Sequence, residues 1–132
     1  MSQENVEVVR LYYAATNRAD DDAVRALLAP DFVADASRRL IEPGVWRGRD
    51  QAIEAALRVR EAWGSLQVEP EQLIPVGDRV VAIVQNRAMG KSSGVSVESR
   101  TGQVWTVHNG QLVRFEYFGT PDEALEAVGL RE

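Results

Sequence analysis

The sequence predicts one α+β domain that contains an antiparallel sheet. Apolar residues recur at helical spacing through the first half of the chain, and the second half consists of strand-like runs separated by turn signals. Helices collected at one end of a sequence and strands at the other are typical of α+β folds, with the helices on one face of the sheet. The length of 132 residues fits a single domain over residues 1–132.

Composition limits the kinds of protein that this chain can be. Cysteine is absent, which excludes disulfide bonds and thiolate chemistry. The formal net charge is −5 and the basic residues are scattered, which argues against a nucleic-acid partner. No apolar run approaches the roughly 20 residues that a membrane span needs. The N-terminus is polar and acidic rather than a secretory signal, so we expect a cytoplasmic protein.

Two helices are predicted at the start of the chain. Ser2–Arg18 has a wide apolar arc with Tyr12 at its centre, so this side chain should point straight into the core. Asp22–Leu28 follows as a short helix, because the preceding aspartates can cap it and Pro30 stops it.

The middle of the chain is predicted to hold a short strand, a long connection and a third helix. The strand is Phe32–Ala36, and the connection is Ser37–Gly48. Asp50 then caps a helix that runs to Trp63, with Gly64 as its C-terminal stop. Its inward stripe comprises Ile53, Ala56, Leu57 and Trp63, with Arg60 in the middle.

The second half is predicted to form a meander of strands. These strands lie near Leu66–Ile74, Arg79–Met89, Gly94–His108 and Gln111–Phe118. Asn109-Gly110 is the strongest turn signal, because this pair tolerates the positive φ angles of a type I′ hairpin. Thr120 and Glu123 form a capping box around Pro121, which opens a short C-terminal helix through Val128.

Several strings of this sequence resemble the SnoaL-like branch of the NTF2-like superfamily. They are VRLYYAATNRADDDAVRALLAPDFVADASRR, VWRGRDQAI, GDRVVAIVQNRAMGKSSGVSVE, QVWTVHNGQLVRFEYF and PDEALEAVGL, which together cover nearly the whole chain. The resemblance implies a cone in which a curved sheet wraps around the N-terminal helix and one sheet face lines a pocket. It also implies a homodimer through the outer sheet face. The superfamily hosts isomerases, polyketide cyclases, epoxide hydrolases and binding modules, so the resemblance predicts a fold rather than an activity.

The predicted pocket is small, apolar and rich in aromatic residues. Alternation along Gly94–His108 puts Gln103 and Trp105 on one face, and the pairing seen in ketosteroid isomerases, which share this fold, turns that face toward the cavity. The candidate lining residues are Trp46, Arg60, Trp63, Trp105, Phe115 and Tyr117. Trp46 and Trp63 either shape the mouth or serve as ordinary core or dimer contacts. Arg60 either snorkels to solvent or binds an anion in the pocket.

Asp35 is the candidate general base, since a carboxylate beside an apolar cavity has a raised pKa through desolvation. The resemblance to ketosteroid isomerases implies that Tyr12 donates a hydrogen bond to a carbonyl oxygen and that Gln103 orients the ligand. It places the isomerase aspartate at Ala36 rather than at Asp35, and one residue reverses the face of a strand. Asp35 therefore needs a local bulge to reach the pocket. Otherwise it is exposed, or it pairs with Arg38 or Arg39.

Three classes of function remain open at this stage. The first is a cofactor-independent isomerase or cyclase that moves a proton on a small carbonyl compound. The second is a non-catalytic module that binds a small apolar molecule, and the third is a dimeric interaction module. No cofactor or metal is expected, because the single histidine, His108, precedes a hairpin turn and no metal-ligand spacing is present.

Overall fold

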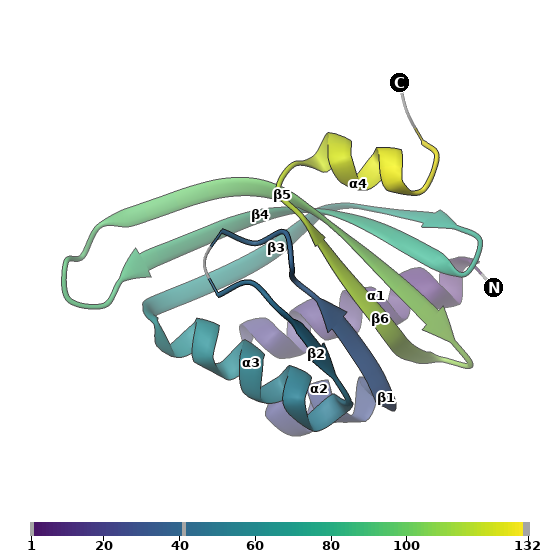
Figure 1. Ribbon diagram of the computed structural model, residues 1–132, viewed down its shortest axis with the longest axis horizontal. Coiled ribbons are helices and arrows are strands. Elements are labelled where there is room, and N and C mark those ends of the chain that lie inside the picture. Colours follow the sequence, from purple (N-terminus) through teal and green to yellow (C-terminus); the bar gives the residue numbers. More distant parts are fainter. Residues whose placement is uncertain (1, 41, 131–132) are drawn as a thin grey trace.

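The computed structural model describes residues 2–40 and 42–130. Its elements are α1 (Ser2–Asn17), α2 (Asp21–Leu27), β1 (Leu28–Asp35), β2 (Val45–Arg47), α3 (Arg49–Glu61), β3 (Trp63–Val76), β4 (Arg79–Gly90), β5 (Ser96–His108), β6 (Gln111–Phe118) and α4 (Pro121–Ala127). One six-stranded sheet separates α1, α2 and α3 from α4, which lies on the opposite face (Figure 1). The predicted α+β class is confirmed, and so is the short C-terminal helix.

The sheet is antiparallel except at one place. Its strand order is β2-β1-β6-β5-β4-β3, and β1 runs parallel to β6. The predicted antiparallel sheet therefore contains one parallel pair that the sequence did not indicate. The reason is that β1 and β6 are joined through the rest of the domain, so no local turn signal in the sequence reports how they pair. Neighbouring strands joined by hairpins are antiparallel, as their turns require.

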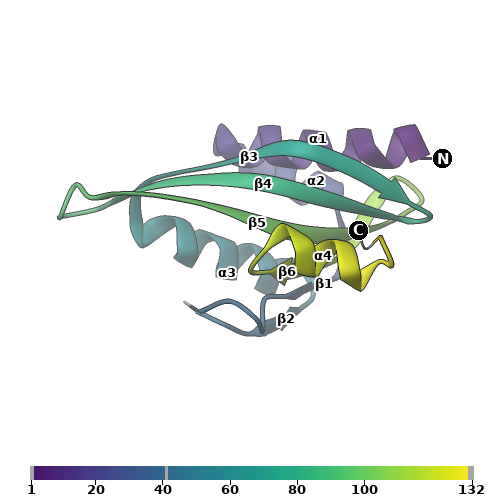
Figure 2. The same cartoon turned by 90° about the horizontal axis from the view of Figure 1, so that it is seen from above.

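The sheet curves around the helices, which gives the molecule its cone shape. Helix α3 contacts β1 near one edge of the sheet and β3 at the other edge, so the sheet must roll to bring both within reach. Register shifts interrupt the pairing of β1 with β6, of β3 with β4 and of β5 with β6, and such bulges increase local bending and twist. Helix α1 packs across β3 to β6 on the concave side, and Figure 2 shows the same layers from above.

The first half of β4, residues 80–84, is buried on both faces, which explains its unbroken apolar run. Val80, Ala82 and Val84 join the inner cluster with α1, whereas Val81 and Ile83 join an outer cluster under α4. Full burial of each valine or isoleucine side chain stabilises the fold by roughly 1.5–3 kcal/mol. The expectation that all helices lie on one face was wrong, because α4 covers this second apolar strip.

Helix α4 sits so close to the sheet that only glycine fits beneath it. A Cβ atom on Gly102 would lie 2.5 Å from the Cβ of Ala124 and 3.0 Å from the carbonyl oxygen of Thr120. The outer face beyond α4 carries exposed ion pairs, among them Arg87–Glu69 at 3.1 Å and Arg100–Glu71 at 2.8 Å. The predicted homodimer through the outer face stays a prediction, and α4 occupies part of that face.

Helix α3 differs from its prediction at both ends. Its N-cap is Gly48, with φ of 92° and no side-chain cap bond, while the carboxylate of Asp50 pairs with Arg25 instead. The helix ends at Glu61, so Trp63 lies at the start of β3 and pairs with Gly90. The connection predicted over residues 37–48 contains β2, which pairs with β1.

The two strongest local signals are confirmed. Asn109 and Gly110 have φ angles of 52° and 78°, as a type I′ turn requires. The Thr120 hydroxyl accepts a hydrogen bond from the Glu123 backbone N–H at 3.2 Å, and Pro121 opens the helix.

Within the described ranges, no helix is long and apolar enough to cross a lipid bilayer.

Candidate functional site

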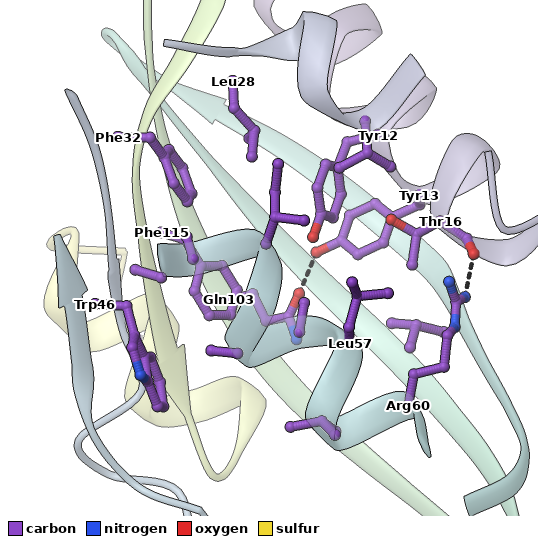
Figure 3. A pocket seen from close by; sticks show the side chains of 18 of the residues that line it. Tyr12, Tyr13, Thr16, Leu28, Phe32, Trp46, Leu57, Arg60, Gln103 and Phe115 are labelled. Atoms are coloured by element: carbon purple, nitrogen blue, oxygen red, sulfur yellow. Dashed lines mark hydrogen bonds between the residues drawn. The ribbon is translucent and has the colours of Figure 1, made fainter. Parts of the chain in front are cut away.

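A cavity of about 170 Å³ lies between α1, α3 and the concave face of the sheet. The residues of the predicted site that line it are Tyr12, Trp46, Arg60, Gln103, Trp105 and Phe115. Helix α1 supplies Tyr12, Tyr13 and Thr16 from one side, and Gln103 faces them from the sheet (Figure 3). Apolar and aromatic side chains dominate the wall, which is the usual composition of a small-molecule pocket.

A chain of hydrogen bonds crosses the cavity wall through Tyr13. The indole N–H of Trp105 donates to the Tyr13 hydroxyl oxygen at 2.8 Å. The Tyr13 hydroxyl in turn donates to Oε1 of Gln103, which is drawn as a dashed line in Figure 3. An indole N–H can only donate, so the Tyr13 oxygen acts as acceptor toward Trp105 and gives its own proton to Gln103. This arrangement fixes which end of the Gln103 amide is the acceptor.

Gln103 therefore presents a donor to the cavity. Its oxygen is engaged by Tyr13, and in the described part of the chain its Nε2 group has no hydrogen-bond partner. Gln103 is buried and lines the pocket. A buried amide with one end fixed and the other unbonded is suited to bind an oxygen atom of a ligand.

Tyr12 and Tyr13 divide the roles that the sequence suggested for Tyr12 alone. Adjacent residues on a helix point about 100° apart, so both cannot point straight inward. Tyr13 is 2% exposed and bonded on both sides, whereas Tyr12 is partly buried on the cavity wall, with its ring 4.5 Å from that of Trp105. Tyr12 therefore points inward, but to the cavity wall, and Tyr13 is the more deeply buried of the two. Sequence reasoning missed that Tyr13 is the residue that meets Gln103.

Burial raises the pKa of both tyrosines above the ordinary value, and for Tyr12 the nearby Thr16 hydroxyl, Arg60 and Arg39 act against this effect. Both therefore stay protonated near neutral pH, so Tyr12 can donate a hydrogen bond. The Thr16 hydroxyl lies near Tyr12, yet Oγ1 of Thr16 is buried without a hydrogen bond of good geometry in the described structure. The α1 side of the cavity thus carries polar hydrogens that a ligand can meet.

Arg60 lines the pocket, but its guanidinium is engaged. It donates a hydrogen bond to the backbone carbonyl oxygen of Thr16 in the last turn of α1 (Figure 3). A cation at a helix C-terminus interacts favourably with the helix dipole. Neither alternative from the sequence describes this contact fully, since Arg60 joins α3 to the end of α1.

Asp35 does not lie among the residues that line the cavity. One of its carboxylate oxygens accepts hydrogen bonds from the Ser37 hydroxyl at 2.6 Å and the Ser37 N–H at 3.1 Å. The other lies 3.3 Å from a guanidinium nitrogen of Arg114 on β6. The Ser37 bonds in particular hold the pKa of Asp35 below its usual range. The expected raised pKa was wrong, because no bulge turns this residue inward and its neighbour Ala34 takes the pocket position.

Two further predicted lining residues lie elsewhere. Trp63 begins β3, after the end of α3, and Tyr117 packs at the edge of the inner cluster; neither is among the described lining residues. The lining residues that the sequence did not suggest include Asp21 and Arg39. Asp21 is the only carboxylate among the described lining residues. No cluster of three or more potential metal ligands is present in the described part of the chain.

Comparison with known proteins places this fold in a large group. An NTF2-like protein of unknown function from Burkholderia pseudomallei is 28% identical, with a TM-score of 0.78, covering 98% of this chain and 99% of that one. A candidate SnoaL-like polyketide cyclase from Jannaschia sp. CCS1 is 22% identical, with a TM-score of 0.79 and coverage of 100% and 96%. TerC, co-crystallised with polyporic acid, is 20% identical, with a TM-score of 0.77 and coverage of 95% and 97%.

No curated protein matches the sequence. The SnoaL-like domain family, in contrast, matches residues 9–115, which include the C-terminal part of α1 and all of the described lining residues of the pocket. The match extends over more than half of the chain and agrees with the NTF2-like neighbours. This chain belongs to the SnoaL-like family and has the NTF2-like, ketosteroid isomerase-like fold.

Proposed function

We propose that this protein binds a small, largely apolar carbonyl compound in the cavity and stabilises the oxyanion that forms when the compound loses a proton. This is the chemistry of a cofactor-independent isomerase or cyclase. The observation that carries the proposal is the Gln103 amide, which Tyr13 holds with its Nε2 donor unbonded in the described structure. Donors fixed in place before the reaction stabilise developing negative charge without reorganisation.

The surroundings of Gln103 support this proposal. The Tyr12 hydroxyl stays protonated because burial raises its pKa, and it shares the cavity wall with Gln103. The rings of Trp105 and Phe115, with centroids 4.8 Å apart, provide an apolar surface for the rest of the ligand. Several structural neighbours are named as candidate polyketide cyclases.

The proposal needs a proton acceptor other than Asp35, because Asp35 pairs with Arg114 away from the cavity. Asp21, in the first turn of α2, is the only carboxylate in the described lining and is the candidate acceptor. Asp21 is exposed to solvent. This feature favours a second candidate function, a binding module in which the same donors hold a ligand without turnover.

Exchange of ketone protons with solvent separates the two candidates. We would mix the protein with 2-tetralone in D₂O and follow both line broadening and loss of the α-proton signals by NMR. The proposal predicts binding and exchange faster than in buffer. Loss of one oxyanion donor in Gln103→Leu should slow this exchange by about 10²-fold. Tyr12→Phe should slow it as well.

Tyr117→Phe is the matched control, because it removes the same hydroxyl from a ring outside the described lining. This variant should exchange the ketone as fast as the unmodified protein. Binding without accelerated exchange would assign the module function instead. A chain that neither broadens the ketone signals nor accelerates their loss would contradict the proposal.

A further inference from the structure

The segment between β1 and β2 is a closed loop that carries Arg39 to the cavity. At its base, the Ala36 N–H donates to the Gly44 carbonyl oxygen at 2.8 Å, and the Gly44 N–H donates back at 3.3 Å. This exchange continues the β1–β2 pairing, in which Asp35 lies opposite Val45. The Arg39 N–H also donates to the Ala36 carbonyl oxygen at 3.0 Å. These backbone hydrogen bonds therefore fix the position of the Arg39 backbone relative to the end of β1.

Arg39 is a partly buried cation in the wall of the cavity. Its guanidinium carbon lies 5.5 Å from the centre of the Tyr117 ring, in a cation–π contact. No carboxylate lies within 4.0 Å of it in the described part of the chain. The charge of Glu42, on the same loop, acts on it from farther away, and Glu42 is exposed.

The other arginines near Arg39 are either bonded to the protein or lie outside the described lining. The Arg60 guanidinium is bonded to the Thr16 carbonyl oxygen, as described above. Arg38 is exposed and lies over the Phe118 ring at 4.7 Å, outside the described lining. Of the two arginines in the described lining, Arg39 is therefore the one whose side-chain N–H groups make no hydrogen bond to the described chain.

We propose that Arg39 determines the specificity of this pocket and that the ligand carries a carboxylate or a comparably acidic oxygen, which Arg39 binds. The proposal rests on the pocket function proposed above, because it requires a ligand in the cavity. A partly buried cation without a counter-ion is costly, and an anionic ligand removes that cost. The planar guanidinium also offers parallel N–H groups that match the two oxygens of a carboxylate. Burial lowers the pKa of Arg39, but an arginine remains charged at neutral pH.

Two probes of the same shape test this proposal. Cinnamate and cinnamamide differ in charge but hardly in size, and their affinities for the full chain can be measured by calorimetry near neutral pH. We expect cinnamate to bind about 10-fold to 100-fold more tightly, since a hydrogen bond between charged groups is stronger than a neutral one. Added salt should weaken cinnamate binding and leave cinnamamide binding unchanged.

Arg39→Met should remove the preference for cinnamate while the affinity for cinnamamide stays within about 2-fold. Arg38→Met is the matched control, because it removes the same charge from the adjacent loop residue that points away from the cavity. This variant should keep the full preference. Retained cinnamamide binding also shows that a variant is folded.

The outcomes separate this proposal from the one on which it rests. If cinnamamide binds and cinnamate is not preferred, the assignment of Arg39 is wrong while the pocket function stands. The same conclusion follows if Arg38→Met loses the preference as fully as Arg39→Met does. If neither probe binds to the unmodified protein, both proposals are contradicted.

Discussion

Removal of one oxygen atom in Tyr13→Phe should destabilise the fold far more than its size suggests. The substitution keeps the ring but leaves the Trp105 indole N–H without an acceptor and Oε1 of Gln103 without a donor. Trp105 is 1% exposed and Gln103 is 9% exposed, so water cannot replace the hydroxyl easily. An unsatisfied buried polar group costs about 1–3 kcal/mol, which gives about 2–6 kcal/mol for the two groups together. That is a large part of the 5–15 kcal/mol that stabilises a typical domain.

The measurement is the free energy of unfolding in urea, followed by tryptophan fluorescence and far-UV circular dichroism. Tyr12→Phe is the matched control, since it removes the same atom from the next residue of α1. Its hydroxyl makes no bond of good geometry with Thr16, so the loss should be about 1 kcal/mol or less. In Tyr13→Phe/Gln103→Leu, the unsatisfied Gln103 oxygen is gone as well. The double variant should therefore lose at least about 1 kcal/mol less than the sum of the single losses.

Two results would refute this reasoning. Equal losses in Tyr12→Phe and Tyr13→Phe would show that the buried network contributes nothing beyond the ring. Strict additivity in the double variant would show that Tyr13 and Gln103 do not act through each other. In either case the claim that Tyr13 holds the Gln103 amide for a ligand would lose its basis.

Two further predictions concern the sheet on either side of the pocket. Gly102→Ala should lower the free energy of unfolding by about 1–3 kcal/mol, because the added methyl group would overlap Ala124 and push α4 away. Gly119→Ala is the control: its added methyl group would meet only a flexible carboxylate at 3.5 Å, so its stability in the same urea assay should hardly change. Asp35 should affect stability and not ligand binding. Its pKa in the folded state is below the unfolded value of 3.8, chiefly through Ser37, so its contribution is present above about pH 4 and is lost as the pH falls through the folded pKa. Asp35→Asn should thus be less stable than the unmodified chain near pH 6, and the two should converge as the pH falls below the folded pKa of Asp35. A constant difference across this range, or weaker cinnamamide binding in the variant, would contradict this assignment.

Local patterns in the sequence were sufficient for the strands and turns that build the pocket face. Strand β6 has the predicted bounds, Gln111–Phe118, because Asn109-Gly110 marks its start without ambiguity. Period-2 alternation correctly placed Gln103 and Trp105 on one face, since successive side chains of a strand point to opposite sides. These features depend on neighbours in the chain and can be read without knowing the fold.

Features that depend on distant contacts could not be predicted in the same way. Two such features are the parallel pairing of β1 with β6 and the packing of α4 against Gly102. In both, the segments that meet share no local signal in the sequence. The choice between Tyr12 and Tyr13 also depends on where β5 crosses α1, and a wide apolar arc does not report that position. The sequence suggested Arg39 only as a possible partner of Asp35. Its place in the cavity wall depends on the pairing of Ala36 with Gly44, which sets the path of the loop that carries it.

The one-residue offset on β1 has the largest consequence for function. Ala34 faces the cavity and Asp35 faces Arg114, so among the described lining residues there are donors and a cation, but the exposed Asp21 is the only carboxylate. We expect such a site to bind negative charge well and to remove protons poorly. A ligand that is already anionic, or a carbonyl compound whose proton is acidic enough to leave without a buried base, therefore fits the chemistry of the cavity better than a ketone with weakly acidic protons. The Gln103 donor and the Arg39 cation then act on the same property of the ligand, an oxygen that carries negative charge when bound.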